Sequence, residues 1–509
     1  MGGKGKKSLM LNCGISGLFR SSRRFIESRF ILLSILFAIA LFMIFHFQGT
    51  ISPDESSNLL LGKKILQYEY NQDFFQRMPL IPFLISLFYL VGFGADAVML
   101  LIPLFFTVLS IPSTYLLARE VSNEKIARIT TVLLLFFTEF WRWGAFILAD
   151  IPMMVFSSFS LYFFAKALKN KKYFYHFGLF LGLSSVTKLT FVILPFTIFL
   201  YMFFRKKTTI MSTREFLSGI IIAVVIFSVF FLAVYGMRGV VDTKQLESIS
   251  GRITNKYKSA ITGSQSITYF AQLILFPLLI FLPFAYPRRF RMRGLLAIYS
   301  ILFLVIIMFL WVVRLRYFSP LYPIIMLFTA QGYAFLRKKY RKITDCAFIL
   351  LAIVSLLNVF YIISLDSKSN WGHEILAGEI KNMKGLFASD YFPLYLNITN
   401  DVLTGNAEVA DFFSNFSEGS AERYGVRYII ISIYAEWNRE PDNTAYFHPT
   451  MGPFEVTFVR RPYSNGRVPP DYTFRSGLFD RLENSPRYEK IREIFSPEGQ
   501  KIFILYRIA

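Results

Sequence analysis

The protein has 509 residues, of which 54% are hydrophobic, 18% aromatic and only 17% charged. Soluble proteins usually carry about 25% charged residues, so a water-soluble enzyme is excluded as a description of the whole chain. The formal net charge is +22, but residues 1–365 hold 39 Lys/Arg against 14 Asp/Glu, whereas residues 366–509 hold 16 against 19. The basic excess therefore lies among the apolar runs, which excludes a nucleic-acid-binding protein and predicts a polytopic membrane protein with a mildly acidic soluble tail.

The first predicted element is a membrane anchor. A basic segment, residues 1–29, precedes the apolar run Phe30–Gln48, and no small-x-small cleavage site follows that run. This order is typical of a retained signal anchor with a cytoplasmic N-terminus. Cys13 and Cys346 are too few and too far apart for a disulfide framework, so we expect free thiols on the cytoplasmic side.

Long apolar runs continue to residue 364. A helix needs roughly 20 residues to cross a bilayer, and Lys/Arg in short loops mark the cytoplasmic side. We predict eleven spans, at residues 30–48, 97–118, 128–141, 150–168, 173–187, 190–204, 216–235, 267–286, 294–313, 318–336 and 344–364. The short basic loops then lie in the cytoplasm, at residues 119–128, 169–172, 205–207, 288–293 and 337–342.

The apolar piece Pro79–Phe93 is left out of this count, because one more span would place the basic loops outside. It is short and begins with Pro79 and Pro82, which favours a helix in the outer interface. Two outer loops are long, residues 49–96, which include this helix, and residues 236–266.

Residues 30–364 are thus the predicted transmembrane domain, of about 11 helices plus the interfacial helix. Residues 365–509 are predicted to form a small extracytoplasmic domain of α/β or α+β fold. Its expected elements are a helix near Glu374–Gly385 and strands at Val426–Ile433, Phe454–Val459 and Lys501–Tyr506.

Ionisable residues collect at the predicted outer ends of the spans, where the positive-inside rule predicts few cations. Ionisable groups near a membrane are costly and mark functional sites. The set consists of Asp54, Glu55, Arg77, Asp150, Lys188, Arg314 and Arg316, with Tyr317 following the last arginine. These residues come from separate parts of the chain and share the depth at which a lipid phosphate lies.

Each residue also has a purely structural interpretation. Asp54 and Glu55 fit ordinary loop carboxylates, and Asp150 before Ile-Pro fits a helix N-cap. For Lys188 and Arg316 the structural interpretation is a snorkelling anchor, in which the hydrocarbon part of the side chain lies along apolar surface and the charged group reaches water. Their coincidence on one face of the membrane favours a shared site over these separate explanations.

Such a set suits sugar transfer from a lipid phosphate. Lys and Arg offset the charge that develops on a leaving phosphate. A carboxylate near an acceptor hydroxyl can act as its general base. A second acidic site could bind a divalent metal or orient the acceptor, and grooves between helices would hold the polyprenyl chain.

These pieces resemble the membrane glycosyltransferases of the GT-C fold, in the branch of dolichyl-phosphate-mannose protein mannosyltransferases and lipid A aminoarabinose transferases. The resemblance covers Phe30 to about Gly332. It is carried by Asp54-Glu55 after the first span, Arg77-Met-Pro-Leu, Asp150, Gly182-Leu-Ser-Ser-Val-Thr-Lys188-Leu-Thr and Arg316-Tyr-Phe-Ser-Pro-Leu-Tyr-Pro323.

The resemblance implies a role for each residue. Asp54 would be the catalytic base or would orient the acceptor, with Glu55 supporting it, and Asp150 would be the second acidic site. Because Asp150 has no acidic neighbour, a divalent metal held by Asp54 or Asp150 is left open, and no other cofactor is implied. The residues that would bind the donor are Arg77, Lys188, Arg314, Arg316 and Tyr317.

Two other functions fit the sequence less well. An oligosaccharyltransferase shares the fold but needs a Trp-Trp-Asp-type motif in its outer domain, whereas the tail has only Trp371 and Trp437, which are isolated. A transporter or flippase of a lipid-linked or anionic substrate predicts charges near the bilayer midplane and often an internal repeat, whereas the charges here lie at one face.

We therefore expect an integral plasma-membrane enzyme, surrounded by membrane lipids, that transfers one sugar on the extracytoplasmic face. Its donor would be a polyprenyl phosphate carrying a monosaccharide. Its acceptor is left open between a protein, a lipid and a lipid-linked glycan, and the sugar is not specified. No nucleic acid is expected as a partner.

Overall fold

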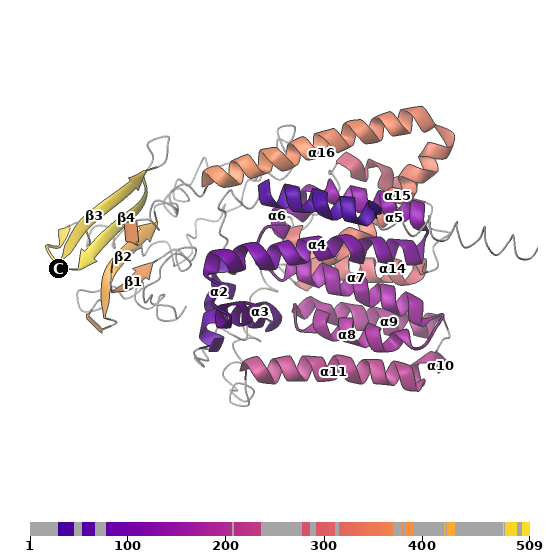
Figure 1. Cartoon of the computed structure of the whole chain (residues 1–509), viewed down its shortest axis with the longest axis horizontal. Helices are drawn as coiled ribbons and strands as arrows, with labels where there is room; N and C mark the ends of the chain where they lie inside the picture. Colours follow the sequence, from indigo (N-terminus) through magenta and orange to yellow (C-terminus); the bar gives the residue numbers. More distant parts are fainter. Residues whose placement is uncertain are drawn as a thin grey trace, which may run out of the picture.

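The computed structural model is mostly helical, with one small β-sheet (Figure 1). The structure describes residues 29–44, 53–66, 78–205, 208–235, 277–285, 292–310, 315–369, 379–380, 383, 385–389, 422–423, 425–432, 482, 484–495 and 501–508.

The helical part begins with an apolar helix at Arg29–Ile44. The α-helices that follow are α2 (Pro53–Leu66), α3 (Leu80–Leu90), α4 (Ala95–Val121), α5 (Glu124–Leu135), α6 (Thr138–Gly144), α7 (Asp150–Ala167), α8 (Tyr173–Ser185), α9 (Ile193–Phe204), α10 (Thr208–Met211), α11 (Arg214–Tyr235), α14 (Arg293–Leu310), α15 (Tyr322–Lys339) and α16 (Arg341–Ser369). The 3₁₀ helices within the described residues are η2 (Leu189–Val192), η3 (Pro277–Phe284) and η5 (Leu315–Leu321). Each predicted span meets one of these helices, and α3 lies where the interfacial helix was predicted.

Two elements differ from the prediction. The helix expected over residues 128–141 stops at Leu135, and the chain starts the separate helix α6 three residues later. The indole Nε1 of Trp141 donates a hydrogen bond to the carbonyl oxygen of Leu135 (2.6 Å), which occupies one of the carbonyls left over at the end of α5. The outer loop after the first span also contains a helix, α2, with acidic residues at its start and Lys63 and Lys64 in its last turn, as the helix dipole favours.

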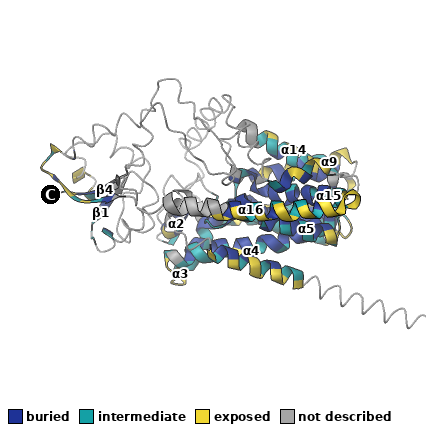
Figure 2. Ribbon diagram, turned by 90° about the horizontal axis from the view of Figure 1, so that it is seen from above, coloured by how far each residue is buried: buried dark blue, intermediate teal, exposed yellow. Residues whose placement is uncertain are grey.

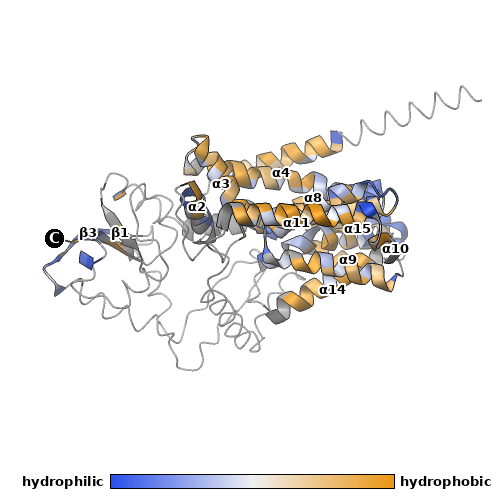
Figure 3. Ribbon diagram, turned by 90° about the horizontal axis from the view of Figure 1, so that it is seen from below, coloured by the Kyte–Doolittle hydropathy of each residue, from blue (hydrophilic) through white to orange (hydrophobic). Residues whose placement is uncertain are grey.

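Apolar side chains cover the outside of the helical part. Among the described residues, Ala97–Val121 and Arg341–Phe360 are long and apolar enough to cross a membrane, and shorter apolar helices accompany them. Figure 3 shows apolar residues along α11 and α14, and Figure 2 shows exposed residues along α16, where Ile343 is 73% exposed. Exposed apolar faces of this extent are typical of a surface that contacts lipid. The total of eleven spans stays a prediction.

The two ends of the helical part differ in character. The end near α10 carries ion pairs at or close to the ends of helices, such as Lys169 with Glu120 and Arg337 with Asp345. The helices α2 and α3 lie at the opposite end, nearer the β-sheet (Figure 1). The loops at the end near α10 are rich in lysine and arginine, and we call this the basic end. The positive-inside rule predicts that it faces the cytoplasm.

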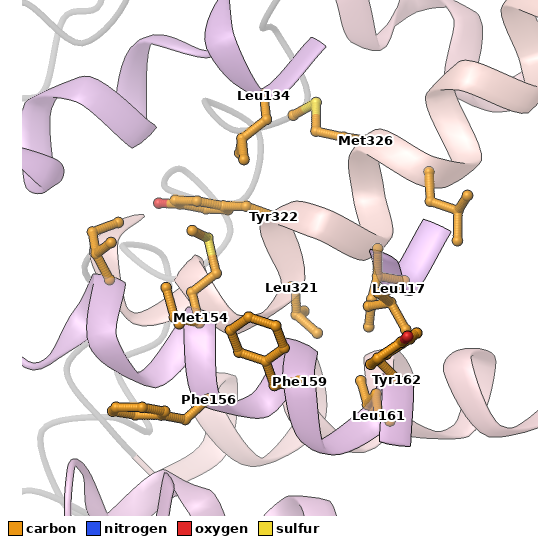
Figure 4. Close-up of a cluster of buried hydrophobic side chains, with 14 of the residues drawn as sticks. Leu117, Leu134, Met154, Phe156, Phe159, Leu161, Tyr162, Leu321, Tyr322 and Met326 are labelled. Atoms are coloured by element: carbon orange, nitrogen blue, oxygen red, sulfur yellow. The ribbon is translucent and has the colours of Figure 1, made fainter. Parts of the chain in front are cut away.

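A large hydrophobic core holds the helices together. Figure 4 shows part of it, in which Met154 of α7 lies beside Tyr322 of α15, Phe159 of α7 lies near Leu321 of η5, and Leu134 of α5 lies beside Met326 of α15. This core packs helices from the first half of the chain, such as α5 and α7, against η5 and α15 from the second half. It thereby places the start of α7 beside η5.

Glycines allow a close contact between the helices α8 and α11. A Cβ added to Gly178 would overlap the backbone of Gly219, and one added to Gly219 would overlap the carbonyl oxygen of Phe174. Small residues let helix backbones approach in membranes, where lipid tails give no hydrophobic driving force between helices. The α8–α11 contact therefore depends on the absence of side chains at these two positions.

The tail contributes a four-stranded sheet in the order β1-β2-β4-β3. Its strands are β1 (Leu386–Ser389), β2 (Val426–Ser432), β3 (Tyr488–Phe495) and β4 (Lys501–Ile508). The β1–β2 pair is parallel, and the other two pairs are antiparallel. A separate small core of Phe387, Ile430 and Leu505 covers one face of the sheet.

The strands β2 and β4 lie where strands were predicted. The strand expected at Phe454–Val459 lies outside the described residues, as does most of the helix expected near Glu374–Gly385. The strands β1 and β3 were not predicted. Because β1 is only four residues long and β3 is rich in charged residues, neither has a strong apolar pattern.

Candidate functional site

An ion pair joins the start of α7 to the turn after α8. Lys188 Nζ donates to Asp150 Oδ1, and the hydroxyl of Ser319 in η5 donates to the carbonyl oxygen of Asp150 (2.8 Å). The Asp150 residue is only 3% exposed. The N-cap of α7 is Ala149, with no side-chain cap bond, so the interpretation of Asp150 as a helix N-cap is wrong. Asp150 is a buried carboxylate paired with a cation.

One aromatic ring lies beside two cations. The Nζ atom of Lys188 lies 4.3 Å from the centre of the Tyr317 ring, and the Cζ atom of Arg316 lies 5.4 Å from the same centre. Positive charges within about 6 Å of a ring face are attracted by it. Because Arg316 is only 6% exposed, it is an inward-facing residue, and its interpretation as a cation reaching out to water is wrong.

A second ring and a further carboxylate complete this group. The Cζ atom of Arg316 lies 5.5 Å from the centre of the Trp143 ring, and Trp143 Nε1 donates to Glu139 Oε2 (2.7 Å). Glu139 is only 4% exposed. Sequence reasoning missed both residues of α6, although an acidic residue within an apolar run, with a tryptophan four positions later, was a signal that could have found them.

The helix α2 is fastened to the segment that leads into α7. Glu55 Oε1 accepts a hydrogen bond from the backbone nitrogen of Ile147 (2.9 Å), and Asn58 Nδ2 donates to the carbonyl oxygen of Ile147 (2.7 Å). Glu55 and Asn58 are three positions apart, so they share one face of α2. Glu55 is 2% exposed and therefore acts here as a buried structural acceptor.

The helix α3 is also fastened near the ion pair. The backbone nitrogen of Leu80 donates to the carbonyl oxygen of Val186 (3.0 Å), two residues before Lys188. A Cβ added to Gly62 of α2 would overlap the side chain of Ile85 of α3, so these two helices pack closely. Consequently α2, α3, α7 and the turn after α8 form one connected end of the bundle.

The structure brings together four of the eight predicted site residues, namely Asp150, Lys188, Arg316 and Tyr317. A fifth, Glu55, is bonded to Ile147, three positions before Asp150. Asp54 precedes Glu55 in α2 and so belongs to the same end of the bundle, but its side chain lies outside the described residues. Arg77 and Arg314 also lie outside the described residues.

The described residues do not fit a divalent metal. No group of three or more His, Cys, Asp or Glu within the described ranges is arranged to hold one. In addition, the Asp150 carboxylate is paired with Lys188, so little negative charge is left at that carboxylate to hold a metal ion. The chemistry that this end of the bundle supports is binding of an anion by two neighbouring cations.

Solved structures similar to this chain are membrane glycosyltransferases of the GT-C fold. ArnT from Cupriavidus metallidurans, crystallised with undecaprenyl phosphate, matches with a TM-score of 0.60 and 12% identity, over 82% of this chain and 95% of that one. The apo oligosaccharyltransferase of Archaeoglobus fulgidus matches with a TM-score of 0.54 and 15% identity, over 80% and 70%. The same enzyme tethered to an acceptor peptide matches with a TM-score of 0.54 and 14% identity, over 93% and 73%. The protein therefore has the GT-C fold.

A family model supports the same assignment for part of the chain. Residues 76–232 match the family described as dolichyl-phosphate-mannose-protein mannosyltransferase. This segment runs from the residue before Arg77 to within α11 and includes Asp150 and Lys188. No curated protein matches the sequence. The resemblance to GT-C glycosyltransferases is thus confirmed, by the family model and by the solved structures together.

Proposed function

We propose that the protein is an integral-membrane glycosyltransferase that moves one monosaccharide from a polyprenyl phosphate to an acceptor on the extracytoplasmic face. The observation that supports this most is that two cations, Lys188 and the buried Arg316, both lie against the ring of Tyr317. They lie in a fold whose solved example from Cupriavidus metallidurans holds undecaprenyl phosphate.

Lys188 and Arg316 bind the donor phosphate. Charge-assisted hydrogen bonds from an ammonium and a guanidinium to phosphate oxygens are stronger than neutral ones. Asp150 holds the Lys188 ammonium at the end of the bundle, and Ser319 holds the backbone of Asp150. Arg77 and Arg314 are further cations for the same phosphate.

Asp54 is the general base. Its carboxylate takes the proton from the acceptor hydroxyl, the acceptor oxygen bonds to the anomeric carbon, and the bond from that carbon to the phosphate oxygen breaks. The polyprenyl phosphate leaves with the electron pair and one more negative charge than it had in the donor. Glu55 supports Asp54 by fastening α2 to Ile147.

The proposed topology has eleven spans in residues 30–364, with residues 1–29 in the cytoplasm and residues 365–509 outside. The helix α3 lies in the outer interface, beside the ion pair at Lys188. The acceptor is a protein, a lipid or a lipid-linked glycan that reaches this outer end.

An oligosaccharide donor is the second candidate, because the oligosaccharyltransferase of Archaeoglobus fulgidus shares the fold. The two donors are distinguished by the same assay. Purified full-length protein in nanodiscs is given polyprenyl-phosphate monosaccharides or lipid-linked oligosaccharides, with a membrane extract as the source of acceptors, and release of the polyprenyl phosphate or pyrophosphate is followed by mass spectrometry.

We expect release from one monosaccharide donor by the wild type and none by Asp54→Asn. Glu120→Gln is the matched control, because Glu120 is a carboxylate paired with Lys169 at the opposite end of the bundle, and it should release lipid phosphate at the wild-type rate. Release only from lipid-linked oligosaccharides would select the second candidate. Wild-type release by Asp54→Asn would remove Asp54 from the role of base.

A further inference from the structure

Two side chains of α2 bind the backbone of one residue, Ile147. The backbone nitrogen of Ile147 donates to Glu55 Oε1 (2.9 Å), and its carbonyl oxygen accepts from Asn58 Nδ2 (2.7 Å). We call this pair of bonds the Ile147 clasp. The three residues are 1–4% exposed, so both bonds are made away from water. Because two bonds of opposite direction meet at one residue, α2 cannot slide or turn at this point without breaking one of them.

The place of Ile147 in the chain explains why side chains bind its backbone. Ile147 lies in residues 145–149, the link between the end of α6 and the start of α7. A buried backbone N–H or C=O outside a helix or strand needs a side chain or a water as its partner. Glu55 and Asn58 are three positions apart on one face of α2, and they supply an acceptor and a donor. The clasp therefore joins α2 to the link that leads into α7.

The two halves of α2 are held by different neighbours. In the second half, a Cβ added to Gly62 would overlap the side chain of Ile85, so α2 packs tightly on α3, which lies beside it in Figure 1. In the first half, the clasp holds Glu55 and Asn58. Asp54 is the second residue of α2 and directly precedes Glu55. The clasp therefore fixes the turn of α2 that carries Asp54.

The start of α7 has anchors of its own. Asp150 follows Ile147 by three positions, and its carboxylate is paired with Lys188 of the turn after α8. Its carbonyl oxygen accepts from the hydroxyl of Ser319 in η5 (2.8 Å). These bonds come from elements other than α2. Loss of the clasp should consequently displace the first turns of α2 more than it displaces the ion pair.

We propose that Asn58 is a positioning residue that, together with Glu55, fixes the place of Asp54. The inference rests on the proposed function, in which Asp54 is the base and Lys188 and Arg316 bind the donor phosphate. The clasp thereby sets the distance between the base and the donor. A general base must lie within hydrogen-bond reach of the hydroxyl that it deprotonates, and supporting bonds hold such a group in place. Asn58 therefore affects the rate of sugar transfer and not the affinity for the lipid phosphate.

The test measures rate and affinity separately, on full-length protein in nanodiscs. The rate is the single-turnover release of lipid phosphate from the polyprenyl-phosphate monosaccharide that the wild type uses, with a membrane extract as the source of acceptors. The affinity is the Kd of a short-chain polyprenyl phosphate. Asn58→Leu has a similar shape but no donor for the carbonyl oxygen of Ile147. Its rate should fall about 10- to 100-fold, as a misplacement of about 1 Å would cause, while the Kd stays within about 2-fold of the wild type.

The matched control is Tyr333→Phe. It removes a hydroxyl that donates to Asp345 Oδ1 (2.6 Å) at the basic end of the bundle, so it also loses one hydrogen bond made by a side chain. Both variants should have a lower melting temperature than the wild type, and Tyr333→Phe should keep the wild-type rate. An equal loss of rate in the two variants would attribute the effect to lost stability and overturn the positioning role.

The outcomes separate the inference from the proposed function. If the wild type released no lipid phosphate from any polyprenyl-phosphate donor, both would be overturned. If the wild type released it and Asn58→Leu did so at the same rate, only the positioning role would be overturned. A loss of affinity in Asn58→Leu as large as its loss of rate would also overturn that role. Should Asn58→Leu fail to fold, as judged by its melting temperature, Asn58→Ala decides, because it removes the amide without adding bulk: a lower rate at the wild-type Kd supports the role, and the wild-type rate contradicts it.

Discussion

Lys188 and Asp150 form an ion pair although 38 positions separate them in the chain. The pair connects the turn after α8 to the first residue of α7, and the aspartate is almost fully buried. Removing one partner of a buried pair leaves an uncompensated charge, which costs more than the pair itself contributes. The pair therefore gives a way to separate stability from ligand binding.

Lys188→Ala should lower both donor affinity and stability. We expect the donor Kd to rise about 10-fold and the free energy of unfolding to fall by about 3–5 kcal/mol, because Asp150 loses its partner and is left as a buried charge. The double variant Lys188→Met with Asp150→Asn should recover the melting temperature but not donor affinity, since no unpaired charge remains. Donor titration and thermal unfolding measure these effects. Unchanged donor affinity in both Lys188→Ala and Arg316→Ala would refute the phosphate-binding role.

Variants of Glu55 distinguish a structural role of its side-chain oxygen from a role of its negative charge in the reaction. Glu55→Ala leaves the backbone nitrogen of Ile147 without the acceptor that it now has, and we expect a loss of about 1–3 kcal/mol in the free energy of unfolding. Glu55→Gln retains a side-chain oxygen and should keep the wild-type melting temperature and turnover. Loss of turnover in Glu55→Gln at an unchanged melting temperature would show instead that the Glu55 charge acts in the reaction.

Gly178→Val should weaken the contact between α8 and α11. Its side chain would overlap the backbone of Gly219, and overpacking of this kind costs about 1–3 kcal/mol. The matched control is Gly294→Ala, because the nearest heavy atom to a Cβ there lies at 3.6 Å, an ordinary van der Waals distance. Thermal unfolding in detergent should show a lower melting temperature for Gly178→Val alone. Equal melting temperatures would mean that α11 can move away without cost.

The proposed topology is tested by labelling in intact cells. Cys346 is exposed and lies in the first turns of α16, at the basic end of the bundle. In a Cys13→Ser background, a membrane-impermeant thiol reagent should label Cys346 only after the cells are opened, whereas a tag added after Ala509 should be accessible in intact cells. Labelling of Cys346 from outside, or a tag reached only after permeabilisation, would reverse the orientation.

Local patterns in the sequence predicted much of the helical part. Apolar runs bounded by basic loops gave the positions of helices such as α4, α7 and α16, and two prolines before an apolar run indicated α3. These features are local, because the length and hydropathy of a segment decide whether it can be helical in a membrane. The same rule assigned Asp150, Lys188 and Arg316 to one face, since the ends of consecutive spans alternate between the two sides.

The break between α5 and α6 was not evident from the sequence. The run that contains Phe136 and Phe137 is as apolar as a helix interior, and the break is stabilised by the contact from Trp141 back to Leu135. Glu139 and Trp143 were missed for the same reason, because they were assigned to the end of a span or to the loop after it. A pattern of hydropathy alone does not distinguish a continuous helix from two helices joined by a turn.

The sequence by itself predicted a membrane protein, with basic loops on one side and a group of ionisable residues on the other. Only the tertiary structure decided the partners within that group: Asp150 with Lys188, Glu55 with the backbone of Ile147, and Arg316 with Trp143. The physical reason is one of range. Hydropathy and charge act on neighbouring residues, whereas these partners are brought together by the packing of helices whose sequences lie tens of residues or more apart.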